Sequence, residues 1–207
     1  MDLLTLRGDA LRYPIVMPSR RITLVAFDLD NTLVDRDEAF HTGLKQWMQK
    51  TTGLDEHGED LPQQITRLDA NGYTPRTEFC TGLAGLLGTT RSKADQIWDG
   101  IRQSMLASIR PDRRVHEILT TLTTHTHLAL ISNGSADTQR SKLRSAELEQ
   151  YFSQILISEE VGMAKPDSAI FQRLFSDGRH KPEGSLFVGD HPAHDIAGAR
   201  NLSLIHI

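Results

Sequence analysis

The chain has a single cysteine and no long apolar run. Cys80 stands alone among 207 residues, which excludes an internal disulfide and a cysteine-rich zinc site. Apolar runs such as those at residues 24–27 and 128–131 are four residues long, whereas a membrane-spanning helix needs about 20. The first 20 residues carry several charges and no apolar signal segment. We therefore expect a soluble cytoplasmic protein with no membrane partner.

The chain also lacks an excess of basic residues. It has 23 Lys and Arg against 27 Asp and Glu, a formal charge of −4. Proteins that coat nucleic acid need a basic surface for the phosphates, so we expect no nucleic-acid partner. The charged fraction of 24% and apolar fraction of 38% are ordinary for a globular protein and exclude a collagen-like or wholly disordered chain. The length suits one domain, or one domain with an insertion.

Four short stretches have the composition of buried strands. They lie at residues 22–27, 128–132, 154–158 and 185–188, and each is apolar nearly throughout rather than alternating. Helix-like stretches separate the later ones, for example at 136–148 and 166–175. Strands that alternate with helices favour βαβ units, so the sequence predicts an α/β fold with a parallel sheet.

The first two strand-like stretches are too far apart for a single crossover helix. Between them lie four helix-like stretches, at 38–51, 60–71, 76–87 and 93–108, separated by Gly, Pro and Asn residues. We interpret residues 36–110 as an all-α sub-domain inserted after the first strand, which acts as a lid over the strand ends. An elaboration of the sheet edge is the simpler alternative. The core then comprises residues 21–35 and 111–207, and residues 1–20 form a loose N-terminal arm.

Two pairs of carboxylates follow apolar strands. Asp28 and Asp30 come directly after the first strand, and Asp190 and Asp195 come after the fourth. Burial of such acids without partners is costly, but at the strand ends they can share a divalent cation and a phosphate. Carboxylate oxygens suit Mg²⁺.

Smaller signals lie between and beside these acidic pairs. Ser132 ends the second strand next to Asn133, where a hydroxyl and backbone N–H groups could hold a phosphoryl oxygen. Lys165 precedes Pro166, which suits the first position of a helix, and its cation could neutralise a phosphate or hold a carboxylate nucleophile. Taken singly, each pattern favours a simpler interpretation, in which Ser132 is a turn residue and Lys165 a surface charge. The two histidines at 191 and 194 leave a transition-metal site as an alternative to Mg²⁺.

The order of these patterns resembles the haloacid dehalogenase-like (HAD) hydrolase superfamily, subfamily I, with a helical C1-type cap. The resemblance covers about residues 22–200 and implies a Rossmann-like core with a parallel sheet and an inserted all-α cap. The matching motifs are Asp28-Leu29-Asp30-Asn31-Thr32, Ser132-Asn133-Gly134, Lys165-Pro166, and Gly189-Asp190 with Asp195.

The resemblance implies a role for each of these residues. Asp28 is the expected nucleophile, and Asp30 the expected acid and base that protonates the leaving alcohol and then deprotonates water. The Asp28 carboxylate, the Asp30 main-chain carbonyl and Asp190 are the expected ligands of Mg²⁺. The remaining residues are expected to bind phosphate (Ser132, Asn133 and Lys165) or to support the site (Thr32 and Asp195).

The resemblance implies a Mg²⁺-dependent phosphoester hydrolase that acts on a small phosphorylated metabolite through an aspartyl-phosphate. Asp30 favours this activity over the dehalogenases of the superfamily, which lack an acid at that position. A phosphomutase, a dehalogenase and a non-enzymatic receiver-like phosphoacceptor module remain alternatives, although a receiver would be shorter and would lack the helical insertion. The motifs leave the substrate and the oligomeric state open.

Two expectations concern segments outside the motifs. In the insertion, we expect Trp47 and Trp98 to lie in its core. The residues expected to face the site lie near the entry and exit of the insertion: Asp35, Arg36, Asp37 and Arg110. Tyr73 and Arg76 either contact the substrate or belong to an exposed connector. At the other end, we expect residues 203–207 to supply a short fifth strand and the chain to end early, before a segment that would cover this strand. A short natural terminus is the alternative.

Overall fold

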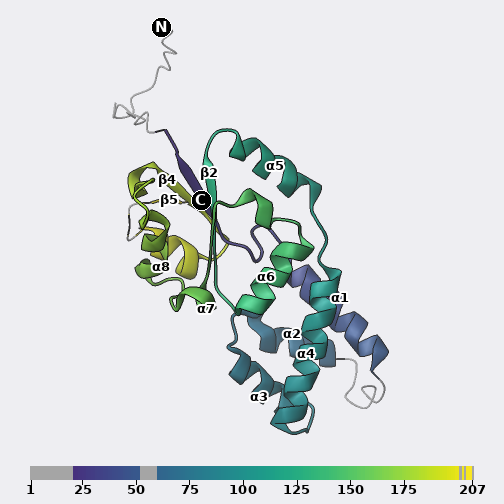
Figure 1. The fold of residues 1–207 in the computed structure, drawn as a ribbon. Helices are drawn as coiled ribbons and strands as arrows, with labels where there is room; N and C mark the ends of the chain where they lie inside the picture. Colours follow the sequence, from purple (N-terminus) through teal and green to yellow (C-terminus); the bar gives the residue numbers. More distant parts are fainter. Residues whose placement is uncertain (1–20, 52–59, 201, 203, 207) are drawn as a thin grey trace, which may run out of the picture.

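The computed structural model describes residues 21–51, 60–200, 202 and 204–206. Within them, five strands form one parallel sheet in the order β3-β2-β1-β4-β5 (Figure 1). The predicted α/β class is therefore confirmed, whereas the expected arm at residues 1–20 lies outside the described residues. The strands are β1 (Leu24–Phe27), β2 (His127–Ser132), β3 (Gln154–Ile157), β4 (Ser185–Val188) and β5 (Ile205–His206).

The apolar strands are buried because both faces of the sheet are covered. On β1, Val25 and Phe27 pack in one core cluster with Leu119 and Leu143 of the helices α5 (Arg113–Thr123) and α6 (Ala136–Ser145). Side chains of a strand alternate between faces, so Leu24 and Ala26 belong to a second cluster. That cluster contains residues of α8 (Ser168–Gln172) and α9 (Ala197–Arg200). The continuous apolar pattern of the strand follows from this double burial.

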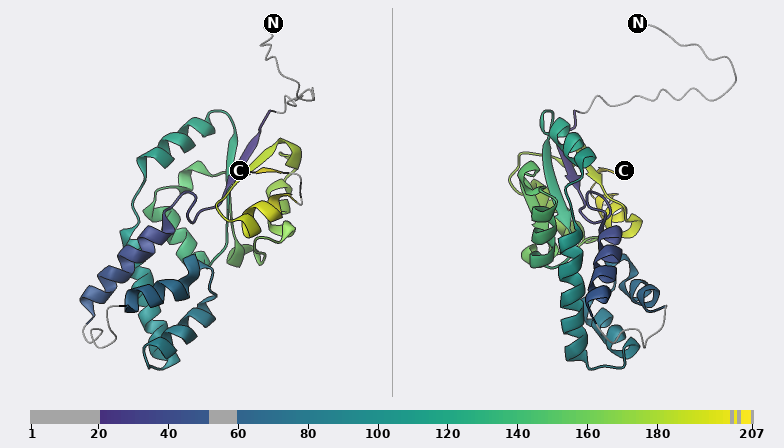
Figure 2. Two further views of the ribbon diagram at one scale, coloured as in Figure 1. Left: turned by 180° about the vertical axis from the view of Figure 1, so that it is seen from behind. Right: turned by 90° about the vertical axis from the view of Figure 1, so that its right-hand side faces the viewer.

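The described part of the region between β1 and α5 consists mainly of helices. It contains α1 (Arg36–Lys50), α2 (Leu61–Asp69), α3 (Arg76–Leu86) and α4 (Arg91–Ser108), with the short helix η2 (Ala70–Gly72) after α2. Figures 1 and 2 show these helices together beyond one end of the sheet. The antiparallel helices α1 and α4 approach closely at Gly43, where an added Cβ would lie 2.3 Å from the Met105 backbone nitrogen.

Shorter helices complete the core of the fold. They are η3 (Glu149–Tyr151), α7 (Ser158–Val161), η4 (Arg173–Phe175), η5 (Pro182–Gly184) and η6 (Pro192–Ile196). None of the helices in the described ranges combines the length and the apolar composition that a membrane crossing requires.

The structure corrects the expected start of the helix after Lys165. Helix α8 begins at Ser168 and not at Pro166, because Asp167 is its N-cap and its carboxylate accepts a hydrogen bond from the Ala169 backbone N–H at 2.9 Å. At the C-terminal end, Ile205 and His206 pair with β4 as a short fifth strand, whereas residues 201, 203 and 207 lie outside the description. The expectation that the chain ends early stays a prediction.

Candidate active site

The candidate site lies where β1, β2 and β4 end. The sheet order reverses between β1 and β4, and ligands of open α/β sheets bind at such a switch point. A cavity of about 550 Å³ opens there between the strand ends and the helices α1–α4. Of the eight residues expected to bind the metal or phosphate, catalyse or support the site, two, Thr32 and Asp190, do not line it; the six that do are Asp28, Asp30, Ser132, Asn133, Lys165 and Asp195.

An ammonium group joins two of these carboxylates. Lys165 Nζ lies 2.5 Å from Asp28 Oδ1 and 2.7 Å from Asp195 Oδ1. All three side chains are buried; the exposed fraction is 6% for Asp28, 4% for Lys165 and 1% for Asp195. Such buried ions are tolerated because each has a partner of opposite charge. The simpler interpretation of the sequence, in which Lys165 is a surface charge, is therefore wrong.

Three carboxylates converge at this point. Oxygens of Asp28, Asp190 and Asp195 lie within 4.8 Å of one another. Gly189 makes this approach possible, because a Cβ at that position would lie 2.4 Å from Asp195 Oδ2. A cluster of hard oxygen donors fits Mg²⁺. In the described part of the chain no histidine belongs to a metal-competent cluster of three or more groups, so the donor set fits Mg²⁺ better than a transition metal.

Burial and crowding change the acidities in this cluster. Burial raises the pKa of Asp28 to about 6; Lys165 opposes the shift, and the charges of Asp195 and Asp30 add to it. The pKa of Asp190 is also raised, by burial first and then by Asp195. The pKa of Lys165 is raised, since the attraction of the two carboxylates outweighs its burial. The site therefore favours a proton or another cation near Asp28.

Asp30 is held by a second lysine, on α6. Lys142 Nζ lies 2.6 and 2.7 Å from the two Asp30 carboxylate oxygens. Gln139 Nε2 donates to Asp30 Oδ2 at 3.0 Å and also to the Ser132 hydroxyl at 2.5 Å. Burial acts to raise the pKa of Asp30, but Lys142 and these hydrogen bonds outweigh it and the pKa is lowered. In this arrangement the Asp30 carboxylate is an acceptor of hydrogen bonds.

Asn133 fixes the backbone of Lys165. Its amide nitrogen donates to the Lys165 carbonyl and its amide oxygen accepts from the Lys165 backbone N–H, both at 2.9 Å. This pair of bonds joins the end of β2 to the segment before α8 and so directs the Lys165 side chain toward β1. The expected contact of Asn133 with phosphate stays a prediction. Thr32 does not line the cavity, and its hydroxyl is buried without a hydrogen-bond partner among the described residues.

A buried ion pair shapes the opposite wall of the cavity. The Arg36 guanidinium, at the start of α1, donates two hydrogen bonds to the Asp69 carboxylate at the end of α2, one of them 2.6 Å long. Asp69 also accepts from the backbone N–H of Gly72 at 2.9 Å. Gly72 has φ +83°, and a Cβ there would lie 2.9 Å from Arg36 Nε, so glycine suits the position on both counts. These contacts hold the turn that carries Tyr73.

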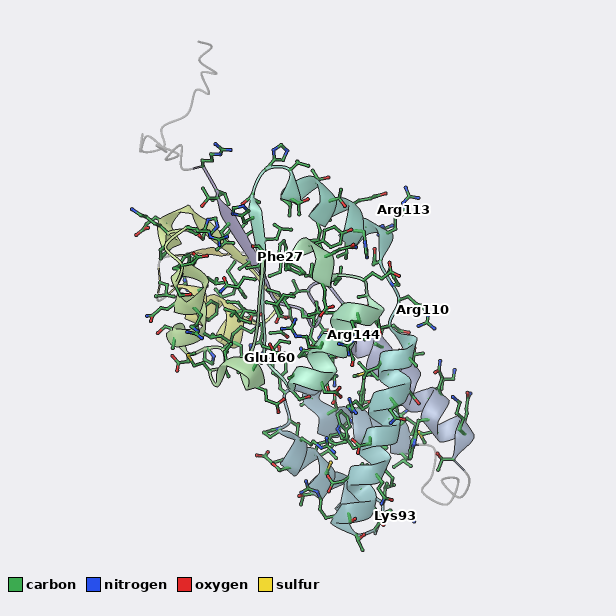
Figure 3. All side chains as sticks on the ribbon, viewed as in Figure 1. Phe27, Lys93, Arg110, Arg113, Arg144 and Glu160 are labelled. Atoms are coloured by element: carbon green, nitrogen blue, oxygen red, sulfur yellow. The ribbon has the colours of Figure 1, made fainter. Side chains whose placement is uncertain are left out.

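Tyr73 lines the cavity and meets the loop after β4. Its ring stacks on His194, with centroids 5.2 Å apart and an angle of 9°, and lies 4.4 Å from the His191 ring. Arg76 and Trp98 also line the cavity, so Trp98 is not confined to the core of the helical region. Tyr73 and Arg76 are exposed residues that border the cavity, and their contact with the substrate stays a prediction. Of the residues expected to face the site from the ends of the insertion, Arg36 lines the cavity, whereas Asp35, Asp37 and Arg110 do not. Arg110 faces away from the site, as Figure 3 shows.

Sequence reasoning missed the residues that hold the expected catalytic groups. Gln139 and Lys142 lie three residues apart on the helix that follows Ser132, so a polar helix face directed at the strand ends could have indicated them. The Arg36–Asp69 pair joins positions 33 residues apart across two helices. No local pattern in the sequence indicates such a contact.

Known proteins resemble this chain in sequence and in structure. Phosphoserine phosphatase of Thermus thermophilus is 47% identical over 73 residues, which are 35% of this chain and 29% of that protein. Glyceraldehyde 3-phosphate phosphatase of Pyrococcus furiosus is 26% identical, and the match covers 89% of this chain and 79% of that protein. The crystal structure of the HAD-hydrolase YfnB of Bacillus subtilis has a TM-score of 0.69 at 22% identity, and the match covers 90% of this chain and 87% of that one.

The sequence profile of one family spans almost the whole described fold. It matches residues 25–205, from the second residue of β1 to the first of β5. That range includes both acidic pairs, Ser132 and Lys165. The chain belongs to the haloacid dehalogenase-like hydrolase family.

Proposed function

We propose that this enzyme hydrolyses small phosphoesters with Asp28 as the nucleophile and a bound Mg²⁺ as cofactor. The observation that carries the proposal is the buried Asp28 carboxylate at the end of β1, held by Lys165 and crowded by two further acids. Relatives named as phosphatases of phosphoserine and of glyceraldehyde 3-phosphate support this class of substrate.

In the first step, the ionised Asp28 carboxylate attacks phosphorus. A bond forms between an Asp28 carboxylate oxygen and phosphorus, and the bond between phosphorus and the ester oxygen breaks. Lys165 orients the nucleophile through its 2.5 Å contact with Oδ1 and offsets negative charge. In this proposal the Ser132 hydroxyl, at the end of β2, donates to a phosphoryl oxygen. The covalent intermediate is an aspartyl-phosphate.

Asp30 handles the protons of both steps. It donates a proton to the leaving alkoxide, and as a carboxylate it then takes one from the water that hydrolyses the aspartyl-phosphate. In the described arrangement Lys142 holds Asp30 in the ionised form, which suits the second role. Proton donation therefore requires that the contact between Lys142 and Asp30 be broken when the substrate binds.

Asp28, Asp190 and Asp195 are the side chains that would hold the metal ion. Their converging oxygens match its preference for carboxylate ligands, and the protein named YfnB was crystallised with magnesium. A bound Mg²⁺ supplies a positive charge that stabilises the negative charge of the phosphoryl group. The role of the Asp30 carbonyl as a further ligand is part of the same proposal.

The helical region acts as a cap over this site. Residues 36–110 form the cap and residues 21–35 and 111–207 the core. Cap residues such as Arg36 and Tyr73 share one cavity with core residues such as Asp28 and Lys165. A cavity of this kind keeps bulk water from the acyl phosphate, and cap opening lets the products leave.

Phosphate release from a panel of phosphoesters, with and without Mg²⁺, tests the proposed function. Asp28→Asn should abolish turnover, whereas Asp177→Asn, on the surface and outside the cavity, should leave it unchanged. Asp30→Asn should slow esters of poor leaving groups more than aryl phosphates, because an aryl oxide needs less help from an acid.

The intermediate can be observed directly. Acid quench during turnover followed by peptide mass spectrometry should find one phosphoryl group on Asp28. Phosphorylation elsewhere, or near-normal turnover by Asp28→Asn, would contradict the mechanism. An isomerised phosphoester in place of free phosphate would favour the mutase alternative.

A further inference from the structure

Helix α4 presents two buried N–H donors that lack an acceptor. Within the described residues, Trp98 Nε1 and Arg102 Nε are buried and have no hydrogen-bond partner. The two residues are four positions apart and so lie on one face of the helix, and both line the cavity. A buried donor without an acceptor is costly, and more so when it is charged. Two such donors in the wall of a substrate cavity indicate that a ligand supplies the acceptors.

The neighbours of these donors hold them in place. Arg102 Nη1 donates to Asp137 of α6 at 2.8 Å, whereas Arg102 Nε lies 3.9 Å from Asp99, beyond hydrogen-bond distance. The Trp98 ring packs edge-on against Phe79, with centroids 4.9 Å apart. The guanidinium is thus tethered at Nη1, while its buried Nε–H has no acceptor among the described residues. This arrangement is organised before a ligand binds.

We propose that Trp98 and Arg102 bind a carboxylate at the end of the substrate remote from its phosphorus. This inference rests on the proposed phosphoester hydrolysis at Asp28. A planar carboxylate can accept from the Nε–H edge of a guanidinium and, with its remaining lone pairs, from an indole N–H. Arg102 already shares its charge with Asp137 and, more distantly, Asp99, which suits a monoanionic carboxylate better than a dianionic second phosphate.

A pair of substrates that differ in one group tests the assignment. In 3-phosphoglycerate a carboxylate replaces a hydroxymethyl group of glycerol 3-phosphate. We expect the wild type to favour 3-phosphoglycerate, as measured by the ratio of the two kcat/KM values. Trp98→Phe keeps an aromatic ring against Phe79 but removes the N–H, and Arg102→Lys keeps the charge but removes Nε. Each should lower the ratio about tenfold, as the loss of one hydrogen bond to a charged group would.

The control is an arginine of the core surface. Arg113, on the outer side of α5 in Figure 3, is strongly exposed and does not line the cavity. Arg113→Gln should leave both the ratio and the turnover unchanged. Melting temperatures of all three variants show whether each is folded, and Arg102→Lys and Trp98→Phe test the inference independently of each other.

The inference and the proposed function can fail separately. Turnover of an aryl phosphate together with no preference for 3-phosphoglycerate, or an unchanged ratio in both cap variants, would overturn the carboxylate site alone. A preference for propanediol bisphosphate over 3-phosphoglycerate would overturn it in favour of a second phosphate. If no ester is hydrolysed, calorimetric binding to Asp28→Asn decides: tighter binding of 3-phosphoglycerate that Trp98→Phe removes supports the site, and equal binding of the pair overturns it.

Discussion

A divalent cation should stabilise the fold against heat, because the candidate metal site holds more negative than positive charge. Oxygens of Asp28, Asp190 and Asp195 converge within 4.8 Å, and Lys165 is the ammonium that contacts two of them. When all three acids are ionised, two negative charges are left over. A bound Mg²⁺ would neutralise them in the folded state and find no comparable site in the unfolded chain.

The raised pKa of Asp28 sets the scale of this effect. A shift from 3.8 to about 6 corresponds to roughly 3 kcal/mol, since one pKa unit is about 1.4 kcal/mol. Between these pH values the folded chain keeps the Asp28 proton and the unfolded chain loses it. The contribution of Asp28 to the free energy of unfolding is therefore complete below pH 3.8 and falls as the pH rises through about 6. At pH 8 the stability of the metal-free protein is therefore lowered by the full cost of ionising the buried Asp28.

Thermal unfolding followed by circular dichroism measures the stabilisation. A ligand at 100 times its Kd adds about 2.7 kcal/mol if it binds only the folded state. For a chain of about 200 residues this raises Tm by roughly 5–10 °C. We expect that rise at pH 8 with Mg²⁺, compared with KCl of equal ionic strength. The rise should be smaller at pH 5, where protons compete for Asp28.

Two variants make the test specific. Asp190→Ala should lose most of the rise and, without metal, should melt no lower than the wild type, because one of three crowded charges is gone. Asp177→Ala removes a surface carboxylate paired with Arg179 and should keep the full rise. An equal rise in wild type and Asp190→Ala, or an equal rise with KCl, would refute the reasoning.

Two further predictions concern the packing of the helical region. Gly43→Ala should lower the free energy of unfolding in urea by roughly 1–3 kcal/mol or more, because its Cβ would lie 2.3 Å from the Met105 backbone; Gly85→Ala, with no atom within 4 Å, should raise it by up to about 1 kcal/mol, and the opposite order would contradict the packing. Asp69→Ala should cost about 3–5 kcal/mol in the same assay, since it removes the two-bond partner of the buried Arg36 guanidinium and leaves only the 3.2 Å contact with Asp37; a loss under 1 kcal/mol would contradict that account.

Most of the fold could be predicted from the sequence because its signals are local. The strands predicted at 22–27, 128–132, 154–158 and 185–188 correspond to β1 to β4 within two residues. The four helix-like stretches of the insertion likewise match α1 to α4. The predicted start of α8 at Pro166 was wrong, because the side chain of Asp167 caps the helix, which therefore begins at Ser168.

The sequence by itself determined which groups stand at the ends of the strands. Asp28 follows a buried strand directly, and Asp190 follows another after Gly189, because the apolar runs end at Phe27 and Val188. Since the carboxyl ends of parallel strands lie at one edge of the sheet, the sequence was enough to predict that Asp28 and Asp190 lie close together.

Only the tertiary structure decided what surrounds those groups. Three features depend on how helices distant in sequence pack together. Lys142 holds Asp30, Arg36 pairs with Asp69, and Trp98 lines the cavity with an N–H that has no acceptor among the described residues. Each of these features depends on residues that are distant in the sequence and meet only when the buried faces of the helices pack together. A one-dimensional pattern fixes the face of a helix but not which neighbour will meet it, so the chemical environment of the site emerges only when the helices are docked.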